Sequence, residues 1–140
     1  MKVLLAESDK KVAAGIKTAL LMCGCEVVSA GTAGRCLTAA QQDKFDLLLI
    51  DLSLPHPTNM DCEEIIRQLK DIHQDAKIIT MASDNTRELE QQIRRHGILC
   101  YLVKPVLPNL IRELVLHLRN RVTSYGIGSH TGVRKEEHWR

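Results

Sequence analysis

The apolar residues of this chain follow two alternating patterns up to about position 122. Short runs of consecutive apolar residues predict buried strands, which we expect at 3–6, 26–30, 45–51, 77–82 and 99–103. Between these runs, apolar residues recur three and four positions apart, which is typical of one face of a helix. We expect helices at 9–23, 32–42, 61–70, 86–97 and 108–122.

The regular alternation of strands and helices predicts the fold class. The run that ends at Asp51 is apolar at almost every position, as in a strand that is buried on both faces of a parallel sheet. Parallel strands joined by helices form right-handed crossovers. We therefore expect an α/β fold with a doubly wound parallel sheet that is covered by helices on both faces.

Length and composition favour one globular domain. At 140 residues the chain can bury one core, which we expect at 1–122, followed by a flexible polar tail at 123–140. The formal net charge of +2 gives no reason to expect a nucleic-acid partner. No apolar stretch approaches the roughly 18 residues of a membrane span, and the first residues do not resemble a signal peptide. We expect a cytoplasmic protein without membrane contact.

The five cysteines do not predict a disulfide framework or a zinc site. Their number is odd, which argues against complete pairing. Cys23 and Cys25 are separated by one glycine, but no second pair of ligands follows at zinc spacing. We expect the cysteines to act as small apolar residues in or beside the core.

Charged residues follow three of the expected strands directly. Glu7, Ser8 and Asp9 follow the first strand, Asp51 ends the third, and Lys104 follows the fifth. Because the carboxyl ends of parallel strands lie at one edge of the sheet, these side chains are expected close together. Asp51, at the centre of this edge, is the main candidate for chemistry.

Three motifs in this order resemble the receiver domain of response regulators in two-component signalling, of the chemotaxis-regulator type. They are Val3-Leu4-Leu5-Ala6-Glu7, Asp51-Leu52-Ser53-Leu54-Pro55 and Tyr101-Leu102-Val103-Lys104-Pro105. The resemblance covers about residues 2–121. It implies a flavodoxin-like (βα)5 three-layer sandwich with strand order 2-1-3-4-5.

The resemblance also implies roles for individual residues. Asp51 matches the carboxylate that accepts a phosphoryl group, and Lys104, followed by a cis peptide to Pro105, matches the lysine that contacts the phosphate. Glu7, Asp51 and the backbone carbonyl of Ser53 match the ligands of Mg²⁺. The implied partner is a histidine kinase or a histidine phosphotransfer protein of a bacterial phosphorelay. The implied activity is signalling rather than turnover as an enzyme.

Three positions depart from the family pattern. Ser8 stands where a second acid usually binds the metal, so we expect Mg²⁺ to bind weakly. Ala82 replaces the usual Thr or Ser of the switch, and the adjacent Ser83 belongs to the opposite strand face. Tyr101 matches the aromatic switch residue. The space beside Ala82 allows it to stay inward with or without phosphate, but an ordinary half-exposed aromatic fits the sequence equally well. Asn59 replaces a Gly, and we expect it to adopt a left-handed backbone conformation.

Surface positions suggest where partners bind. Ala14, Lys17 and Leu21 lie opposite the apolar stripe of the first helix, on the side that meets the phosphodonor in receivers. Leu116 points away from the core stripe of the fifth helix. It is a candidate contact for a homodimer through the face formed by the fourth helix, fifth strand and fifth helix.

Two functional hypotheses follow from these residues. In the first, the chain is a phosphorylated receiver with an impaired metal and switch site. In the second, it is a pseudo-receiver that binds partners without phosphorylation. An unrelated flavodoxin-like cofactor binder is disfavoured, because no Gly-rich phosphate loop follows the first strand. The sequence leaves open whether the chain acts alone or belongs to a longer regulator.

Overall fold

The computed structural model describes residues 1–83 and 86–123, and its elements alternate between strand and helix throughout. The strands are β1 (Lys2–Ala6), β2 (Glu26–Ala30), β3 (Leu47–Asp51), β4 (Lys77–Ala82) and β5 (Cys100–Val103). The helices are α1 (Lys10–Met22), α2 (Ala33–Gln42), α3 (Cys62–Ile72), α4 (Arg87–Arg94) and α5 (Pro108–Thr123). The tail expected after residue 122 lies outside the described residues, apart from Thr123, which ends α5.

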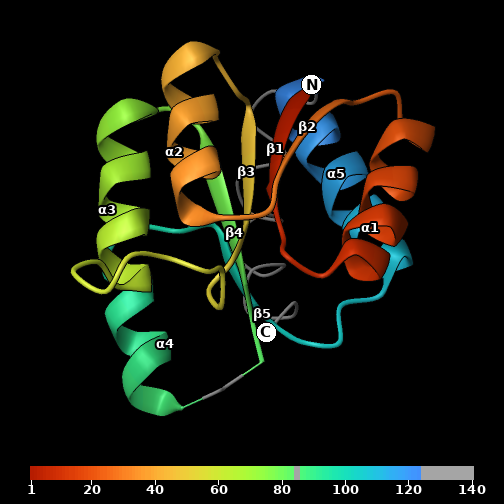
Figure 1. Ribbon diagram of the computed structural model, residues 1–140. Coiled ribbons are helices and arrows are strands. Elements are labelled where there is room, and N and C mark those ends of the chain that lie inside the picture. The colour runs from red at the N-terminus through yellow and green to blue at the C-terminus, as the bar shows by residue number, and fades with distance from the viewer. Residues whose placement is uncertain (84–85, 124–140) are drawn as a thin grey trace.

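The strands form one parallel sheet in the order β2-β1-β3-β4-β5. Figure 1 shows α2, α3 and α4 on one face of this sheet and α1 and α5 on the other. This is the flavodoxin-like three-layer arrangement that the sequence predicted. The carboxyl ends of the strands point toward the bottom of the view, and the loops after β1, β3 and β5 begin at this edge.

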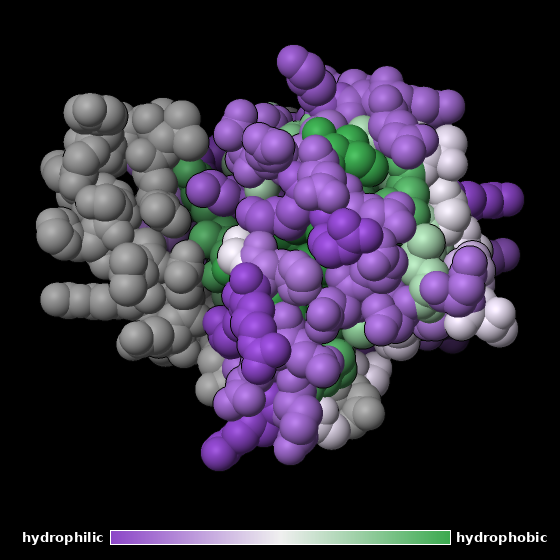
Figure 2. All heavy atoms as spheres, turned by 90° about the vertical axis from the view of Figure 1, so that its left-hand side faces the viewer, coloured by the Kyte–Doolittle hydropathy of each residue, from purple (hydrophilic) through white to green (hydrophobic). Residues whose placement is uncertain are grey.

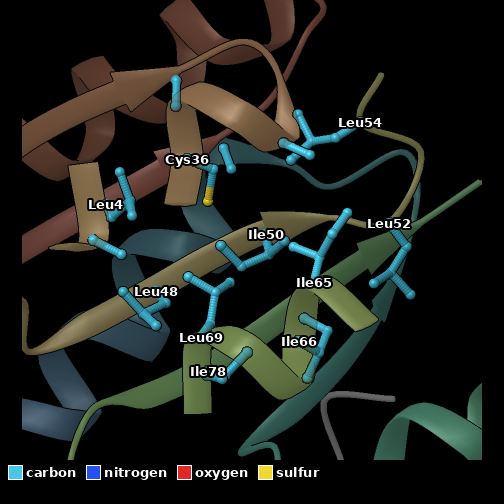
Figure 3. Packing of buried hydrophobic residues seen from close by; sticks show 14 of the residues in the cluster. Leu4, Cys36, Leu48, Ile50, Leu52, Leu54, Ile65, Ile66, Leu69 and Ile78 are labelled. Atoms are coloured by element: carbon cyan, nitrogen blue, oxygen red, sulfur yellow. The ribbon is translucent and has the colours of Figure 1, made fainter. Parts of the chain in front are cut away.

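The central strand β3 is buried on both faces, as its apolar sequence predicted. Leu48 and Ile50 face α2 and α3 and pack with Ile65, Leu69 and other residues of that layer (Figure 3). Leu47 and Leu49 belong to the second cluster, which α1 and α5 cover. Burying each such side chain stabilises the fold by about 1.5–3 kcal/mol. This packing keeps the end of β3, and therefore Asp51, at a defined position.

Helix ends follow the local sequence. The Asp9 carboxylate accepts hydrogen bonds from the backbone N–H groups of Lys11 (2.9 Å) and Val12 (3.1 Å), which confirms it as the N-cap of α1. Gly24 follows that helix with a φ of 79°, a conformation that favours glycine. Helix α4 is shorter than expected and ends at Arg94, because the chain turns there toward Gly97, whose φ is 75°.

One backbone expectation is wrong. Asn59 does not adopt a left-handed conformation, since no non-glycine residue in the described ranges has a positive φ. The loop turns instead between Pro57 and Met60, whose N–H donates to the Pro57 carbonyl at 3.1 Å. His56 is exposed and its Nδ1 lies 2.9 Å from the Pro57 oxygen. This segment forms the rim of the loop after β3.

The cysteines behave as apolar residues. All five lie in the described ranges and none forms a disulfide there. Cys25, Cys36 and Cys100 are buried, and burial raises the pKa of the Cys36 thiol to about 12. A thiol with so high a pKa is not a nucleophile at neutral pH.

The outer face over α2, α3 and α4 is mainly hydrophilic, with small apolar areas between the helices (Figure 2). Within residues 1–83 and 86–123, no helix combines the length and apolar composition that crossing a bilayer requires.

Candidate functional site

The carboxyl edge of the sheet brings together three of the residues that the sequence predicted. Glu7 follows β1, Asp51 ends β3, and Lys104 follows β5. Glu7 and Asp51 are almost inaccessible, with exposed fractions of 4% and 2%. A buried carboxylate requires compensating charge or hydrogen bonds, because transfer out of water disfavours its charged form.

Lys104 supplies that charge to both carboxylates. Its Nζ lies 2.7 Å from Glu7 Oε1 and 3.0 Å from Asp51 Oδ2. The Lys104–Pro105 peptide is cis, as expected, and the Lys104 N–H donates to the carbonyl of Ala82 at 2.8 Å. The ammonium group therefore bridges the two acids and contacts Asp51 through Oδ2.

Ser53 holds the other oxygen of Asp51. Its N–H and its hydroxyl both donate to Asp51 Oδ1, at 3.0 and 2.7 Å. The sequence predicted only the carbonyl of Ser53 as a functional group, so this contribution of the side chain was missed. The spacing could have revealed it, since an Asp side chain commonly accepts from the backbone two residues later. Both oxygens of Asp51 thus have fixed donors.

These contacts shift the pKa values of the three groups in different directions. Burial alone raises the pKa of Asp51, but the hydrogen bonds from Ser53 and Lys104 outweigh burial and hold this pKa below its usual value. Burial also raises the pKa of Glu7, and here it outweighs the lowering by Lys104. Burial lowers the pKa of Lys104, yet its two carboxylate partners keep this pKa above normal. Asp51 is therefore the carboxylate that stays ionised most readily.

The residues at this edge fit Mg²⁺, with a reduced set of charged ligands. Glu7 and Asp51 offer hard carboxylate oxygens beside the backbone of Ser53. Ser8 is exposed and neutral, and Asp9 uses one oxygen to cap α1. No group of three acidic, His or Cys side chains suited to a metal occurs in the described ranges. Among the described residues, the charged groups that this edge offers to a metal are two carboxylates, and Lys104 already bridges them.

The switch positions lack the usual hydroxyl. Ala82 is buried at the end of β4, and Ser83 is exposed. Tyr101 is fully buried, so it is not the half-exposed aromatic that the sequence also allowed. In the sheet, Thr80 pairs with Tyr101 and Ala82 with Val103.

The fold and this edge define a receiver-type signalling domain. A family model described as the response regulator receiver domain matches residues 3–116, and the chain belongs to that family.

Individual relatives are longer proteins. The chain is 27% identical over 135 residues to the two-component response regulator ORR21 of Oryza sativa subsp. indica, covering 94% of this chain and 19% of the relative. It is also 27% identical over 135 residues to the regulatory protein LuxO of Vibrio vulnificus strain YJ016, covering 91% and 29% respectively. The chain thus spans less than a third of these curated relatives.

A solved structure matches the domain along most of its length. The CheY-like receiver domain protein from Methanospirillum hungatei JF-1 is 25% identical and superposes with a TM-score of 0.75. The match covers 88% of this chain and 94% of that chain. The chain is a receiver domain of two-component signal transduction.

Proposed function

We propose that Asp51 accepts a phosphoryl group from a phosphohistidine of a partner protein. The observation that carries this assignment is the contact of Lys104 Nζ with Asp51 Oδ2, at 3.0 Å in a buried edge site. A carboxylate oxygen of Asp51 attacks phosphorus, the P–N bond of the phosphohistidine breaks, and its electron pair remains on the imidazole. The product on this chain is an acyl phosphate.

Lys104 assists this transfer by offsetting charge. Phosphoryl transfer depends mainly on positioning and on electrostatic stabilisation of the phosphoryl oxygens. In the resting site the ammonium group contacts both Glu7 and Asp51 and offsets one of their two negative charges. Once Asp51 is phosphorylated, its carboxylate charge is lost and the phosphoryl oxygens take its place as the partner of Lys104. Glu7 remains as the second contact.

Mg²⁺ is part of the proposal as a weakly bound ion held by Glu7, Asp51 and the carbonyl of Ser53. When bound, it supplies further positive charge to the phosphoryl oxygens. Ser8 contributes no charge, so the protein ligands carry two negative charges where three are usual in the family. The reduced ligand charge supports slow phosphorylation. The missing hydroxyl at Ala82 supports weak coupling between the phosphorylation site and the rest of the fold.

Exposed side chains on α1, β5 and α5 indicate where partners bind. Ala14, Lys17 and Leu21 are exposed on α1, whose first turn lies at the carboxyl edge, and we propose this side for a histidine kinase or histidine phosphotransfer protein. Val103 and Leu116 are 39% and 37% exposed and support a homodimer through α4, β5 and α5. A cytoplasmic location, a polar tail from 123 and the absence of nucleic-acid contact stay predictions.

Incubation with a small-molecule phosphodonor and Mg²⁺, followed by intact-mass measurement, tests the proposal. The native chain should gain one phosphoryl group, while Asp51→Asn should gain none. Asp75→Asn is the matched control, because Asp75 is an exposed aspartate away from the site. If the native chain gains no phosphoryl group at saturating Mg²⁺, the pseudo-receiver function holds instead.

A further inference from the structure

The inner side of α4 carries charged residues where an apolar contact would be expected. Glu90 is only 6% exposed, although it lies on a helix with a mostly polar sequence. Its Oε2 accepts a hydrogen bond from Arg94 Nε at 2.8 Å, one helical turn later. An ion pair between a buried carboxylate and an arginine one turn away on the same helix restricts the conformations of both side chains.

Arg94 in turn covers Tyr101. The guanidinium carbon lies 5.9 Å from the centroid of the Tyr101 ring, within the range of a cation–π contact. The Tyr101 ring is fully buried, and the side chain of Arg94 is one third exposed. Nη2 of Arg94 is buried and donates to no oxygen in the part of the chain that the structure describes. The guanidinium is therefore committed to Glu90 on one side and to the ring on the other.

At the end of β4, the described residue at the switch position beside Tyr101 carries no hydroxyl. Ala82 ends β4 on the same sheet face as Tyr101 and carries only a methyl group. The nearest strand hydroxyl on this face is Thr80, two residues farther from the edge and fully buried. Two strand residues correspond to about 6.6 Å along β4, so the Thr80 hydroxyl lies that much farther back from the end of the strand than the Ala82 position does.

We propose that Arg94, held by Glu90, clamps Tyr101 in its inward position, so that α4 and β5 present one conformation whether or not Asp51 carries a phosphoryl group. Arg94 acts as a positioning residue. The surface formed by α4 and β5 is then available to a partner constitutively, and phosphorylation changes the Asp51 edge without remodelling this surface. The clamp itself rests on the Arg94 contacts. Only its independence from phosphate rests on the proposed role of Asp51.

A fluorine probe on Tyr101 tests the clamp. The chain has two tyrosines, so 3-fluorotyrosine incorporated in a Tyr125→Phe background reports on Tyr101 alone. The ¹⁹F resonance and its shift between H2O and D2O measure how far the ring reaches solvent. We expect one resonance with little solvent shift in the native chain. Arg94→Met should move the resonance and raise the solvent shift several-fold, and Arg94→Lys should give an intermediate result.

Arg95→Met is the matched control, since Arg95 is the neighbouring exposed arginine of the same turn. It should leave the resonance at its native position, and thermal melts should confirm that each variant is folded. If Arg94→Met leaves the ring as protected as Arg95→Met does, the clamp is wrong.

Beryllium fluoride with Mg²⁺ tests the independence from phosphate in the same sample. The amide resonance of Ser53 reports whether the mimic has bound, and the Tyr101 resonance should stay in place once it has. A large movement of Tyr101 on binding overturns the proposal. A Ser53 amide that does not respond counts against the proposed function of Asp51, while the Arg94→Met comparison still decides the clamp.

Discussion

Removal of the bridging ammonium group should destabilise the domain strongly at neutral pH. Lys104→Met keeps much of the side-chain volume but leaves Glu7 and Asp51 buried, at 4% and 2% exposure, without the cation that both contact. Removing one partner of a buried ion pair costs roughly 3–5 kcal/mol. Because the side chain of Lys104 is itself 18% exposed, we expect about 3 kcal/mol of lost unfolding free energy at pH 7.

This loss should depend on pH through Glu7. The pKa of Glu7 is raised above 4.5 by burial, and Lys104 lowers it, so the variant should raise it further. A raised pKa means that the folded state binds the proton more tightly, and folding gains stability as pH falls through that pKa. The pKa of Asp51 is depressed, so its contribution is lost only below about 3.8. The destabilisation should therefore be smaller at pH 5 than at pH 7.

Urea unfolding followed by far-UV circular dichroism measures the loss of unfolding free energy at pH 7 and at pH 5. The midpoint should fall with an unchanged slope, and the melting temperature at pH 7 should fall by about 10 °C for a domain of this size. Lys77→Met is the control, because Lys77 is an exposed lysine at the opposite end of the sheet. A loss below about 1 kcal/mol at pH 7, or an equal loss at both pH values, would refute the reasoning.

Other variants examine the remaining parts of the site. Ser8→Asp should tighten Mg²⁺ binding in a calorimetric titration, since it restores a charged ligand; unchanged affinity would contradict the assigned metal site. Ser53→Ala removes the hydroxyl donor to Asp51 Oδ1, so the pKa of Asp51 should move up toward its usual value in an NMR titration, and a fixed pKa would mean that the hydroxyl is unimportant. Beryllium fluoride should leave most amide shifts across residues 84–103 unchanged, because Ala82 provides no link; broad shifts there would show another route.

Sequence patterns predicted the fold because strand burial and helix capping are both determined by local residues. The apolar run before Asp51, the N-cap at Asp9 and the glycine after α1 each follow from local chemistry, and each is confirmed. The error at Asn59 arose because a turn can close with ordinary backbone angles once a hydrogen bond between Met60 and Pro57 supports it. That bond depends on the path of the whole loop, which a single residue does not reveal.

The sequence predicted which residues form the site but not the contacts between their side chains. Parallel strand ends share an edge, so the proximity of Glu7, Asp51 and Lys104 followed from topology. The side-chain bond from Ser53 and the burial of Glu90 under Arg94 depend on rotamers and on how closely α4 packs. A buried glutamate is unexpected in a helix with a thin apolar stripe, because acidic residues are seldom buried unless paired.

The central claim is that the carboxylate of Asp51 is the phosphoryl acceptor. After incubation with a phosphohistidine-bearing donor protein and Mg²⁺, borohydride reduces an acyl phosphate on aspartate to the alcohol of homoserine and releases phosphate. Peptide mass spectrometry then locates the modified position. We predict homoserine at residue 51 and at no other aspartate, and none in Asp51→Asn. A phosphoryl group that survives in Asp51→Asn, or homoserine at another position in the native chain, would contradict the account.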